Sequence, residues 1–170
     1  MAAPAAQHDG VHIRKGALAD VELVASFNQA MAKETEDLAI PHDVVTRGAK
    51  AVLEGKAAAA YYLLEVDGEN GGDAADDGHK VVAQLMITFE WSDWRAADVW
   101  WVQSVYVRPE YRRRGYFRAL YAHVRAEAQA AGAAGLRLYA DVGNERAHRA
   151  YEGLGMRSHY KVFEDMFTSY

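Results

Sequence analysis

The hydrophobic and polar residues of the first third of the chain follow a helical period. From Asp20, apolar residues recur every three or four positions between Val21 and Met31, which predicts an amphipathic helix with Asp20 as its N-cap. A second helical stretch follows Pro41 and ends at Gly55. We therefore expect two consecutive helices before residue 56.

The second half of the chain predicts two further helices. After Gly115 the apolar residues repeat with a clear helical period, and Gly132 and Gly135 mark the end of this segment. A shorter helix is predicted from Asn144, a good N-cap residue, through Glu152. The apolar positions of the longer helix are 117, 120, 121, 124, 128 and 131.

Short segments rich in β-branched and aromatic residues predict strands. The most apolar of them, 99–107, is expected in the centre of a sheet. Together with the helix after it and the strand at 136–141, it predicts a βαβ unit with two parallel strands. The chain thus predicts an α/β (α+β) fold with a mixed sheet and helices on both faces. The expected strands are 11–14, 58–66, 80–90, 99–107, 136–141 and 158–163.

The length of 170 residues suits one domain with a sizeable core. We expect residues 1–10 to be a flexible leader and 11–170 a single domain. The Gly-, Asp- and Asn-rich segment 67–79 is too long for a tight turn, so a mobile hairpin loop is expected there. A second connection, the polar and aromatic segment 91–98, leads into the strand at 99–107.

Composition narrows the function classes. A net charge of −5 argues against general nucleic-acid binding, and no apolar run approaches the roughly 20 residues of a membrane span. The absence of cysteine excludes disulfides, thiolate metal ligands and a cysteine nucleophile. We expect a cytoplasmic protein with no nucleic-acid partner, no membrane contact and no metal site.

An arginine-rich turn connects the most apolar strand to the helix after it. The strand stops near Pro109, and Gly115 opens the helix. Unpaired backbone amides and the positive end of the helix dipole make such a turn suitable for phosphate. Arginines at 112, 113, 114 and 118 add positive charge there, although Arg-rich turns ending in glycine also occur on ordinary solvated surfaces.

The short predicted helix carries the second candidate set. Asn144, Ala147, His148 and Tyr151 share one helical face and can converge on one ligand. By itself, Tyr151 also fits an ordinary half-buried core tyrosine.

The strand, the Arg-x-x-Gly turn, the helix, the next strand and the Asn-x-x-Ala-x-x-x-Tyr and Gly-Met motifs together resemble the GNAT superfamily of N-acetyltransferases. The resemblance covers about residues 99–163 and implies a GNAT-type fold, mostly antiparallel with a central parallel pair. It also implies acetyl-CoA as co-substrate and an amine as acceptor. Members of this family commonly form dimers, so the resemblance also implies a homodimer.

The resemblance also implies site residues. The pyrophosphate of CoA is expected on the turn, and the pantetheine arm along the preceding strand. Tyr151 is expected to protonate the departing thiolate, and Asn144 to hydrogen-bond near the pantetheine. The implied cofactor-binding residues are Val105, Tyr106, Val107, Arg112, Arg113, Arg114, Gly115, Tyr116, Phe117, Arg118 and Asn144.

Two residues depart from the family pattern. Phe117 stands where the family usually has Gly or Ala, so its side chain must point into the core beside the helix. Gln103 stands where polyamine acetyltransferases carry a Glu, and an amide cannot accept a proton as a base.

The amine must lose a proton before it attacks the thioester. Glu90 and Glu34 are candidate bases, as is Glu36, and a water relay is an equal alternative; a solvated carboxylate remains the ordinary interpretation of each. Without cysteine, we expect direct transfer in a ternary complex.

The acceptor is expected to be the primary amine of a small molecule, such as a polyamine or amino acid. Four tryptophans and nearby carboxylates would suit a cation, although tryptophans at such positions also serve as core and loop packing. Alternatives are a protein lysine or N-terminus, a non-catalytic CoA-binding module, and a nucleic-acid-binding protein, which the acidic charge disfavours. The tryptophans are Trp91, Trp94, Trp100 and Trp101.

Overall fold

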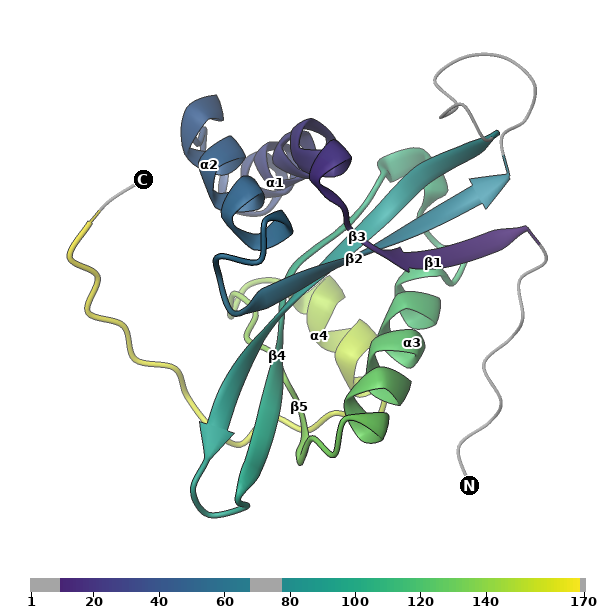
Figure 1. Cartoon of the computed structure of the whole chain (residues 1–170). Coiled ribbons are helices and arrows are strands. Elements are labelled where there is room, and N and C mark those ends of the chain that lie inside the picture. Colours follow the sequence, from purple (N-terminus) through teal and green to yellow (C-terminus); the bar gives the residue numbers. More distant parts are fainter. Residues whose placement is uncertain (1–9, 68–77, 169–170) are drawn as a thin grey trace.

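The computed structural model describes residues 10–67 and 78–168 and shows a five-stranded sheet with helices on both faces (Figure 1). The strands lie in the order β1-β2-β3-β4-β5. They are β1 (Val11–Lys15), β2 (Ala59–Asp67), β3 (His79–Ser92), β4 (Ala97–Val107) and β5 (Gly135–Arg137). The helices are α1 (Val21–Glu36), α2 (His42–Leu53), α3 (Tyr116–Ala130) and α4 (Glu145–Glu152), with short 3-10 helices at Leu18–Asp20 and Pro109–Tyr111.

The sheet is mixed, as the sequence predicts. β1 to β4 pair antiparallel in chain order, and β5 pairs parallel to β4 after the α3 crossover. The βαβ unit is therefore confirmed. Within the described residues the parallel pair lies at one edge of the sheet rather than in its centre, because β5 has no strand on its other side.

The four expected helices are present, and local sequence explains their ends. Asn144 caps α4, because its side-chain oxygen accepts a hydrogen bond from the Ala147 amide at 3.1 Å. Gly132 follows α3 with φ of 75°, a left-handed conformation that glycine adopts at low cost. Among residues 10–67 and 78–168, no helix is both long and apolar enough to cross a membrane.

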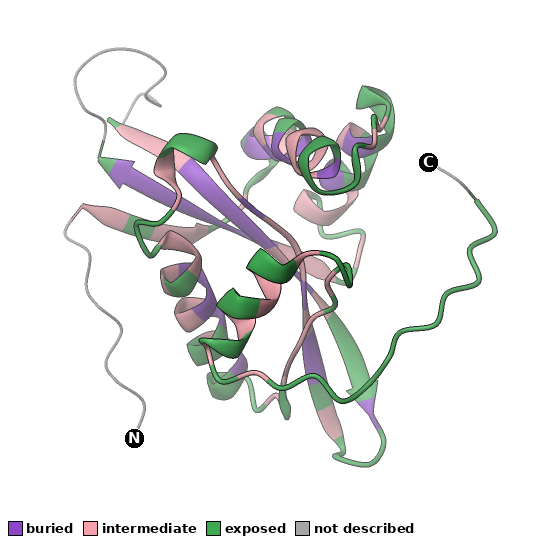
Figure 2. Ribbon diagram, turned by 180° about the vertical axis from the view of Figure 1, so that it is seen from behind, coloured by how far each residue is buried: buried purple, intermediate pink, exposed green. Residues whose placement is uncertain are grey.

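Alternate residues of β2 separate two layers of core. Leu63 is buried in a cluster with Val24 of α1, and its neighbour Leu64 is buried in a cluster with Leu120 of α3. Since successive side chains of a strand point to opposite faces, α1 and α2 cover one face and α3 the other. Figure 2 shows these buried layers from the side of α3 and α4.

A β-bulge interrupts β4 in the middle of the sheet. The register shifts between Gln84 and Met86 of β3, so that Ser104 and Val105 oppose the single residue Leu85. Ser104 has φ of 45°, which is uncommon for a residue other than glycine. A bulge of this kind bends the strand and increases its local twist.

β4 and β5 are paired only over a short stretch. The pairs run from Val99 with Gly135 to Trp101 with Arg137, and no further pair joins the two strands in the described chain. The predicted length of this strand is thus wrong: a strand was expected over 136–141, but β5 covers only Gly135–Arg137. Beyond Trp101, this edge of β4 has no strand paired with it among the described residues, so it is open as far as Val107.

Two other expectations need correction. Residues 158–163 form no strand; they run away from the sheet, and Tyr160 and Phe163 are exposed (Figure 1). Their β propensity has no effect there because no described strand lies alongside to pair with them.

The connection expected over 91–98 is a turn of only four residues, 93–96, because β3 and β4 extend into it. The expected leader and the loop at 67–79 lie almost wholly outside the described residues.

Candidate functional site

The turn between β4 and α3 has the backbone geometry of an anion site. Arg113 and Gly115 both adopt left-handed conformations, with φ of 61° and 83°. α3 then begins without a side-chain cap, so the amides of its first turn have no partner within the helix. A reversal of this type points successive N–H groups into one concavity, which fits a pyrophosphate.

The arginines of the turn divide into two kinds. Arg112 is part-buried, donates from Nε to the Val107 carbonyl at 2.9 Å, and forms a bidentate pair with Glu34 at 2.5 Å. The guanidinium of Arg112 holds the pKa of Glu34 below its ordinary value. Arg113 and Arg118 are exposed beside the open amides. Arg112 therefore fixes the turn to α1, while the exposed arginines remain suited to meet phosphate.

A hollow of about 350 Å³ adjoins the turn. Tyr111, Arg114 and Tyr116 line one side of it, and Gly10 and Asp67 line the other. The Arg114 guanidinium lies 5.1 Å from the centre of the Tyr111 ring. The hollow offers space for the part of a CoA nucleotide that extends beyond the pyrophosphate.

The open edge of β4 leads to the turn. Val105 and Val107 pack against the core on the α3 face, while β4 pairs with β3 through Tyr106 and Val107. The edge that β5 leaves uncovered therefore has backbone groups available for a further extended segment. Amides of a pantetheine arm can pair with such an edge in the manner of an added strand.

Tyr151 lies on α4 beside the start of α3. Its ring is edge-on to Phe117, with centroids 5.7 Å apart. Burial raises the pKa of the Tyr151 phenol above its ordinary value, so the phenol stays protonated and can donate. Asn144, at the N-terminus of the same helix, uses its side-chain oxygen for capping, which leaves its amide nitrogen for any cofactor contact.

Phe117 links the two predicted halves of the site. As expected for a bulky residue at this position, its side chain packs against the core cluster under α3. Its ring also contacts Tyr121, with centroids 6.2 Å apart. Phe117 therefore supports Tyr151 from the helix that carries the phosphate turn.

Two of the three glutamates considered as bases, Glu34 and Glu90, are engaged in ion pairs. Glu90 accepts a hydrogen bond from Trp101 Nε1 at 2.6 Å and one from Arg137 at 2.7 Å. Glu34 is held by Arg112 in the bidentate pair. Arg112 lowers the pKa of Glu34, which makes Glu34 a poorer proton acceptor, and the ion pairs give both residues a positioning role.

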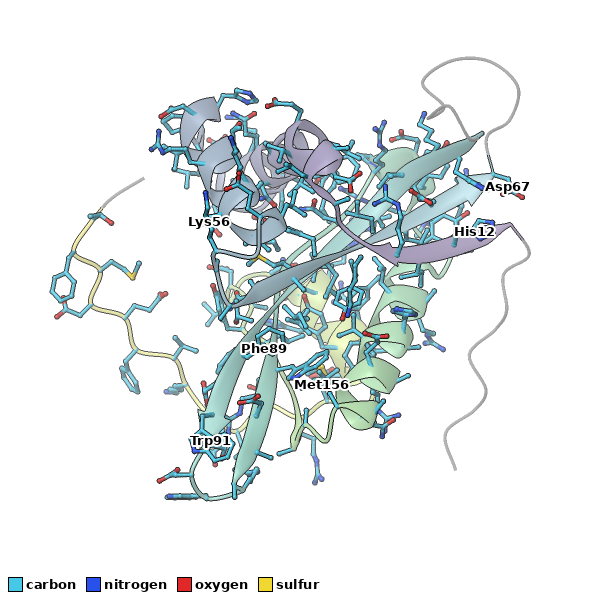
Figure 3. All side chains as sticks on the ribbon, in the orientation of Figure 1. His12, Lys56, Asp67, Phe89, Trp91 and Met156 are labelled. Atoms are coloured by element: carbon cyan, nitrogen blue, oxygen red, sulfur yellow. The ribbon has the colours of Figure 1, made fainter. Side chains whose placement is uncertain are left out.

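The four tryptophans do not form one wall. Trp100 is buried against Phe89, whereas its neighbour Trp101 points to the opposite face of the sheet. Trp91 and Trp94 are exposed at the β3–β4 hairpin, where Figure 3 shows Trp91 near the end of the strand. Only Trp101 lies beside the point where β4 and β5 separate, with its ring 6.3 Å from that of Tyr139.

The sequence analysis did not predict a row of buried, hydrogen-bonded polar side chains beside the bulge. Fully buried Gln84 donates to Asn28 at 2.6 Å, and Asn28 donates to the Tyr61 hydroxyl at 3.0 Å. A polar residue within an apolar strand was the available signal for Gln84. Ser104 carried no signal, because serine has no particular preference for a left-handed bulge.

Comparison with known proteins supports the acetyltransferase class that the sequence motifs predict. The sequence profile of the acetyltransferase (GNAT) family matches residues 32–156. A solved structure described as a possible acetyltransferase from Clostridium difficile 630 is 36% identical, with a TM-score of 0.81, and the alignment covers 95% of this chain and all of that one. A comparison with curated proteins gave no match.

More distant solved structures share the fold. A ribosomal-protein-alanine N-acetyltransferase from Brucella melitensis biovar Abortus 2308 is 18% identical, with a TM-score of 0.70, and the alignment covers 93% of this chain and 99% of that one. A structure described as a predicted acetyltransferase with acetyl-CoA, from Clostridium acetobutylicum, is 17% identical, with a TM-score of 0.68, and the alignment covers 92% of this chain and 96% of that one.

The fold and the family match thus define an acetyltransferase, in which an arginine-rich turn joins β4 to α3. The chain belongs to the GNAT family of acetyltransferases.

Proposed function

We propose that this protein transfers an acetyl group from acetyl-CoA directly to the primary amine of a small molecule. The pyrophosphate would lie on the amides from Arg113 to Arg118, and the pantetheine along the open edge of Val105 to Val107. The observation that carries this proposal is the half-buried Tyr151 phenol, held beside that turn by Phe117.

Tyr151 supplies the proton that the reaction needs at the sulfur. When the amine nitrogen attacks the thioester carbonyl, the C–S bond breaks and the thiolate leaves with the electron pair. A phenol that burial keeps protonated can donate its proton to that thiolate. The nitrogen releases its extra proton to water as the amide forms, and a proton from water restores the Tyr151 phenol, so that the acetyl group ends on nitrogen and CoA leaves as the free thiol.

The amine loses its proton through water in this proposal. Glu34 and Glu90 are both paired with arginines, so neither carboxylate is available to accept a proton without breaking that pair. Water at the point where β4 and β5 separate can carry the proton to bulk solvent. Thr88 and Gln103 provide polar groups on the face of the sheet that carries Trp101, and Gln103 Nε2 lies 3.5 Å from Thr88 Oγ1.

The surface near Trp101 supports a small acceptor. Trp101 is half-buried and Tyr139 is exposed, so the pair offers two aromatic rings to an ammonium group or its aliphatic chain. Arg137 neutralises Glu90 next to them, which favours an acceptor with a single positive charge over a polyamine.

A cytoplasmic location and a homodimer stay predictions.

The test is thiol release from acetyl-CoA in the presence of a panel of amines. The panel contains monoamines, amino acids, polyamines and short peptides with a free N-terminus or lysine. We expect the fastest turnover with a small monoamine or amino acid, and the acetylated product is identified by mass spectrometry. A clear preference for the peptides would instead indicate a protein acetyltransferase.

CoA binding is measured alongside turnover by thermal shift and calorimetry. If CoA raises the melting temperature while no amine releases thiol, the protein is a CoA-binding module and the enzymatic proposal fails. If CoA does not bind at all, the assignment of the turn is wrong as well.

A further inference from the structure

Two histidines and one aspartate meet at one end of the sheet, around the point where β2 ends and β3 begins. His12 comes from β1, Asp67 from β2 and His79 from β3. Figure 3 shows His12 and Asp67 side by side at this end, far from Trp91 at the other. Asp67 also lines the hollow beside the turn, but none of the three is given a catalytic or cofactor-binding role above.

The strand register places all three side chains on one face. Asp67 lies directly opposite His79, and its amide donates to the Gly10 carbonyl at 3.0 Å. His12 follows Gly10 by two residues, so it projects from the same face of the sheet. The fold thus gathers residues that are 55 and 12 positions apart in the chain.

Gly10 makes room for the carboxylate at the centre of this group. Its φ is 74°, and a Cβ atom at this position would lie only 2.7 Å from Asp67 Oδ2. A larger residue would push the aspartate away from the histidines. The backbone therefore leaves room for the carboxylate beside the two imidazoles, whose ring centroids lie 4.6 Å apart.

The distances between the polar atoms match those around a metal ion. His12 Nε2 lies 3.4 Å from Asp67 Oδ1, and His79 Nδ1 lies 3.2 Å from the same oxygen. All three ligand atoms fall within 4.8 Å of one another. Ligand atoms at zinc bond lengths in a tetrahedron are separated by about 3.4 Å, so an ion can be accommodated with small side-chain movements.

We propose that His12, Asp67 and His79 form a binding site for a divalent transition-metal ion, with zinc as the preferred occupant. Two imidazoles and one carboxylate are a ligand set that zinc accepts readily. Magnesium and calcium require more oxygen ligands than this group provides. Three protein ligands leave at least one coordination position for water.

The bound ion would join the ends of three adjacent strands. β1 is an edge strand, and His12 lies near its start, where the chain enters the sheet. An ion held by all three residues would resist separation of β1 from β2 and of β2 from β3. Because the ion binds the folded arrangement, it also raises the stability of the fold.

Isothermal titration of the tag-free, EDTA-stripped full chain with zinc chloride tests the site. We expect one ion per chain, and we expect His79→Ala and Asp67→Asn each to raise the Kd for zinc at least about tenfold. His42→Ala is the matched control, since His42 pairs with Glu22 at 3.1 Å but has no second histidine in that pair. This variant should bind zinc like the parent chain.

Melting curves in EDTA show whether the variants fold, and His12→Gln serves as a milder third variant. Zinc should raise the melting temperature of the parent chain and of His42→Ala, but not that of the three site variants. No saturable binding by the parent chain, or equal affinity in all variants, would mean that these residues form only histidine–aspartate ion pairs and would overturn the proposal. Acetyl transfer measured in EDTA is expected to continue, so the two proposals are tested separately.

Discussion

The ring of Phe117 stands edge-on to the ring of Tyr151, with centroids 5.7 Å apart and an interplanar angle of 71°. Phe117 belongs to the first turn of α3, beside the phosphate turn, and Tyr151 belongs to α4. The contact therefore fixes the position of the proposed acid relative to the proposed cofactor site. Its removal should affect catalysis and stability in separable ways.

Replacing Tyr151 by Phe removes the proton donor and keeps the ring that packs on Phe117. We expect kcat to fall by about 100-fold or more, because general acid catalysis contributes on that scale. The Kd for CoA should change by less than about twofold, since the ring remains in place. Steady-state thiol release and calorimetry measure the two quantities.

Tyr121→Phe is the control, because Tyr121 also contacts Phe117 but faces the core from α3. An equal loss of kcat in both variants would show that the loss is structural. Because burial raises the pKa of Tyr151 above 10.0, its acid form should be retained up to at least that pH. In a plot of rate against pH, deprotonation of Tyr151 should therefore cause no loss of rate below pH 10.

Replacing Phe117 by Leu keeps an apolar side chain but removes the ring contact. We expect the free energy of unfolding to fall by about 1 kcal/mol, the usual contribution of an aromatic pair. We also expect kcat to fall severalfold, because Tyr151 loses its support. Urea unfolding and initial rates measure these effects.

A second edge-on pair offers a matched control. Phe89 and Trp100 pair across β3 and β4, with ring centroids 5.2 Å apart at an angle of 86°, and neither has a proposed role in the reaction. Phe89→Leu should lower stability to a similar degree without changing kcat. If it reduced kcat as much as Phe117→Leu, the positioning role of Phe117 would be refuted.

Replacing Arg112 by Ala should loosen the phosphate turn. The variant loses the bidentate pair with Glu34 and the hydrogen bond to the Val107 carbonyl. Because Glu34 is 43% exposed, we expect a loss of only about 1 kcal/mol in the free energy of unfolding. The KM for acetyl-CoA should rise, as the amides that hold the pyrophosphate become less well ordered.

Arg47→Ala provides the comparison, since Arg47 pairs with Asp43 on the surface of α2. It should leave the KM for acetyl-CoA unchanged. An unchanged KM in Arg112→Ala as well would mean that the pair with Glu34 does not organise the turn.

The Glu34–Arg112 pair should also make stability depend on pH. The hydrogen bond from Arg112 lowers the pKa of Glu34 below its ordinary 4.5 in the folded state. The stabilisation is therefore complete above the ordinary pKa and is lost as the pH falls through the lowered one. Glu34→Gln should be less stable than the parent chain at pH 7, and this difference should shrink as the pH falls below 4.5.

The same comparison in an Arg112→Ala background is the control for this prediction. Without the guanidinium, Glu34→Gln should produce a smaller difference with a weaker dependence on pH. A pH dependence that persists unchanged would assign the effect to another group. Urea unfolding at a series of pH values measures both pairs of variants.

Local sequence was sufficient for the helices and for the turn at Gly115 that opens α3. The periods that begin at Val21 and Phe117, the cap at Asn144 and the glycine at 115 act through neighbouring residues along the chain. Such signals depend on backbone geometry that each segment carries by itself. The family motif across residues 99–163 combined the turn and Tyr151 into one expected site.

The sequence by itself therefore determined the order of the helices and of the five strands of the sheet, and the class of enzyme, and it supplied the residues predicted to bind the cofactor. Only the tertiary structure decided that Arg112 meets Glu34, that Glu90 meets Arg137, and that residues 158–163 find no partner strand. These outcomes depend on register and bulges between distant segments, where a shift of one residue reverses the face of every side chain. For the same reason, His12, Asp67 and His79 come together only in the folded sheet.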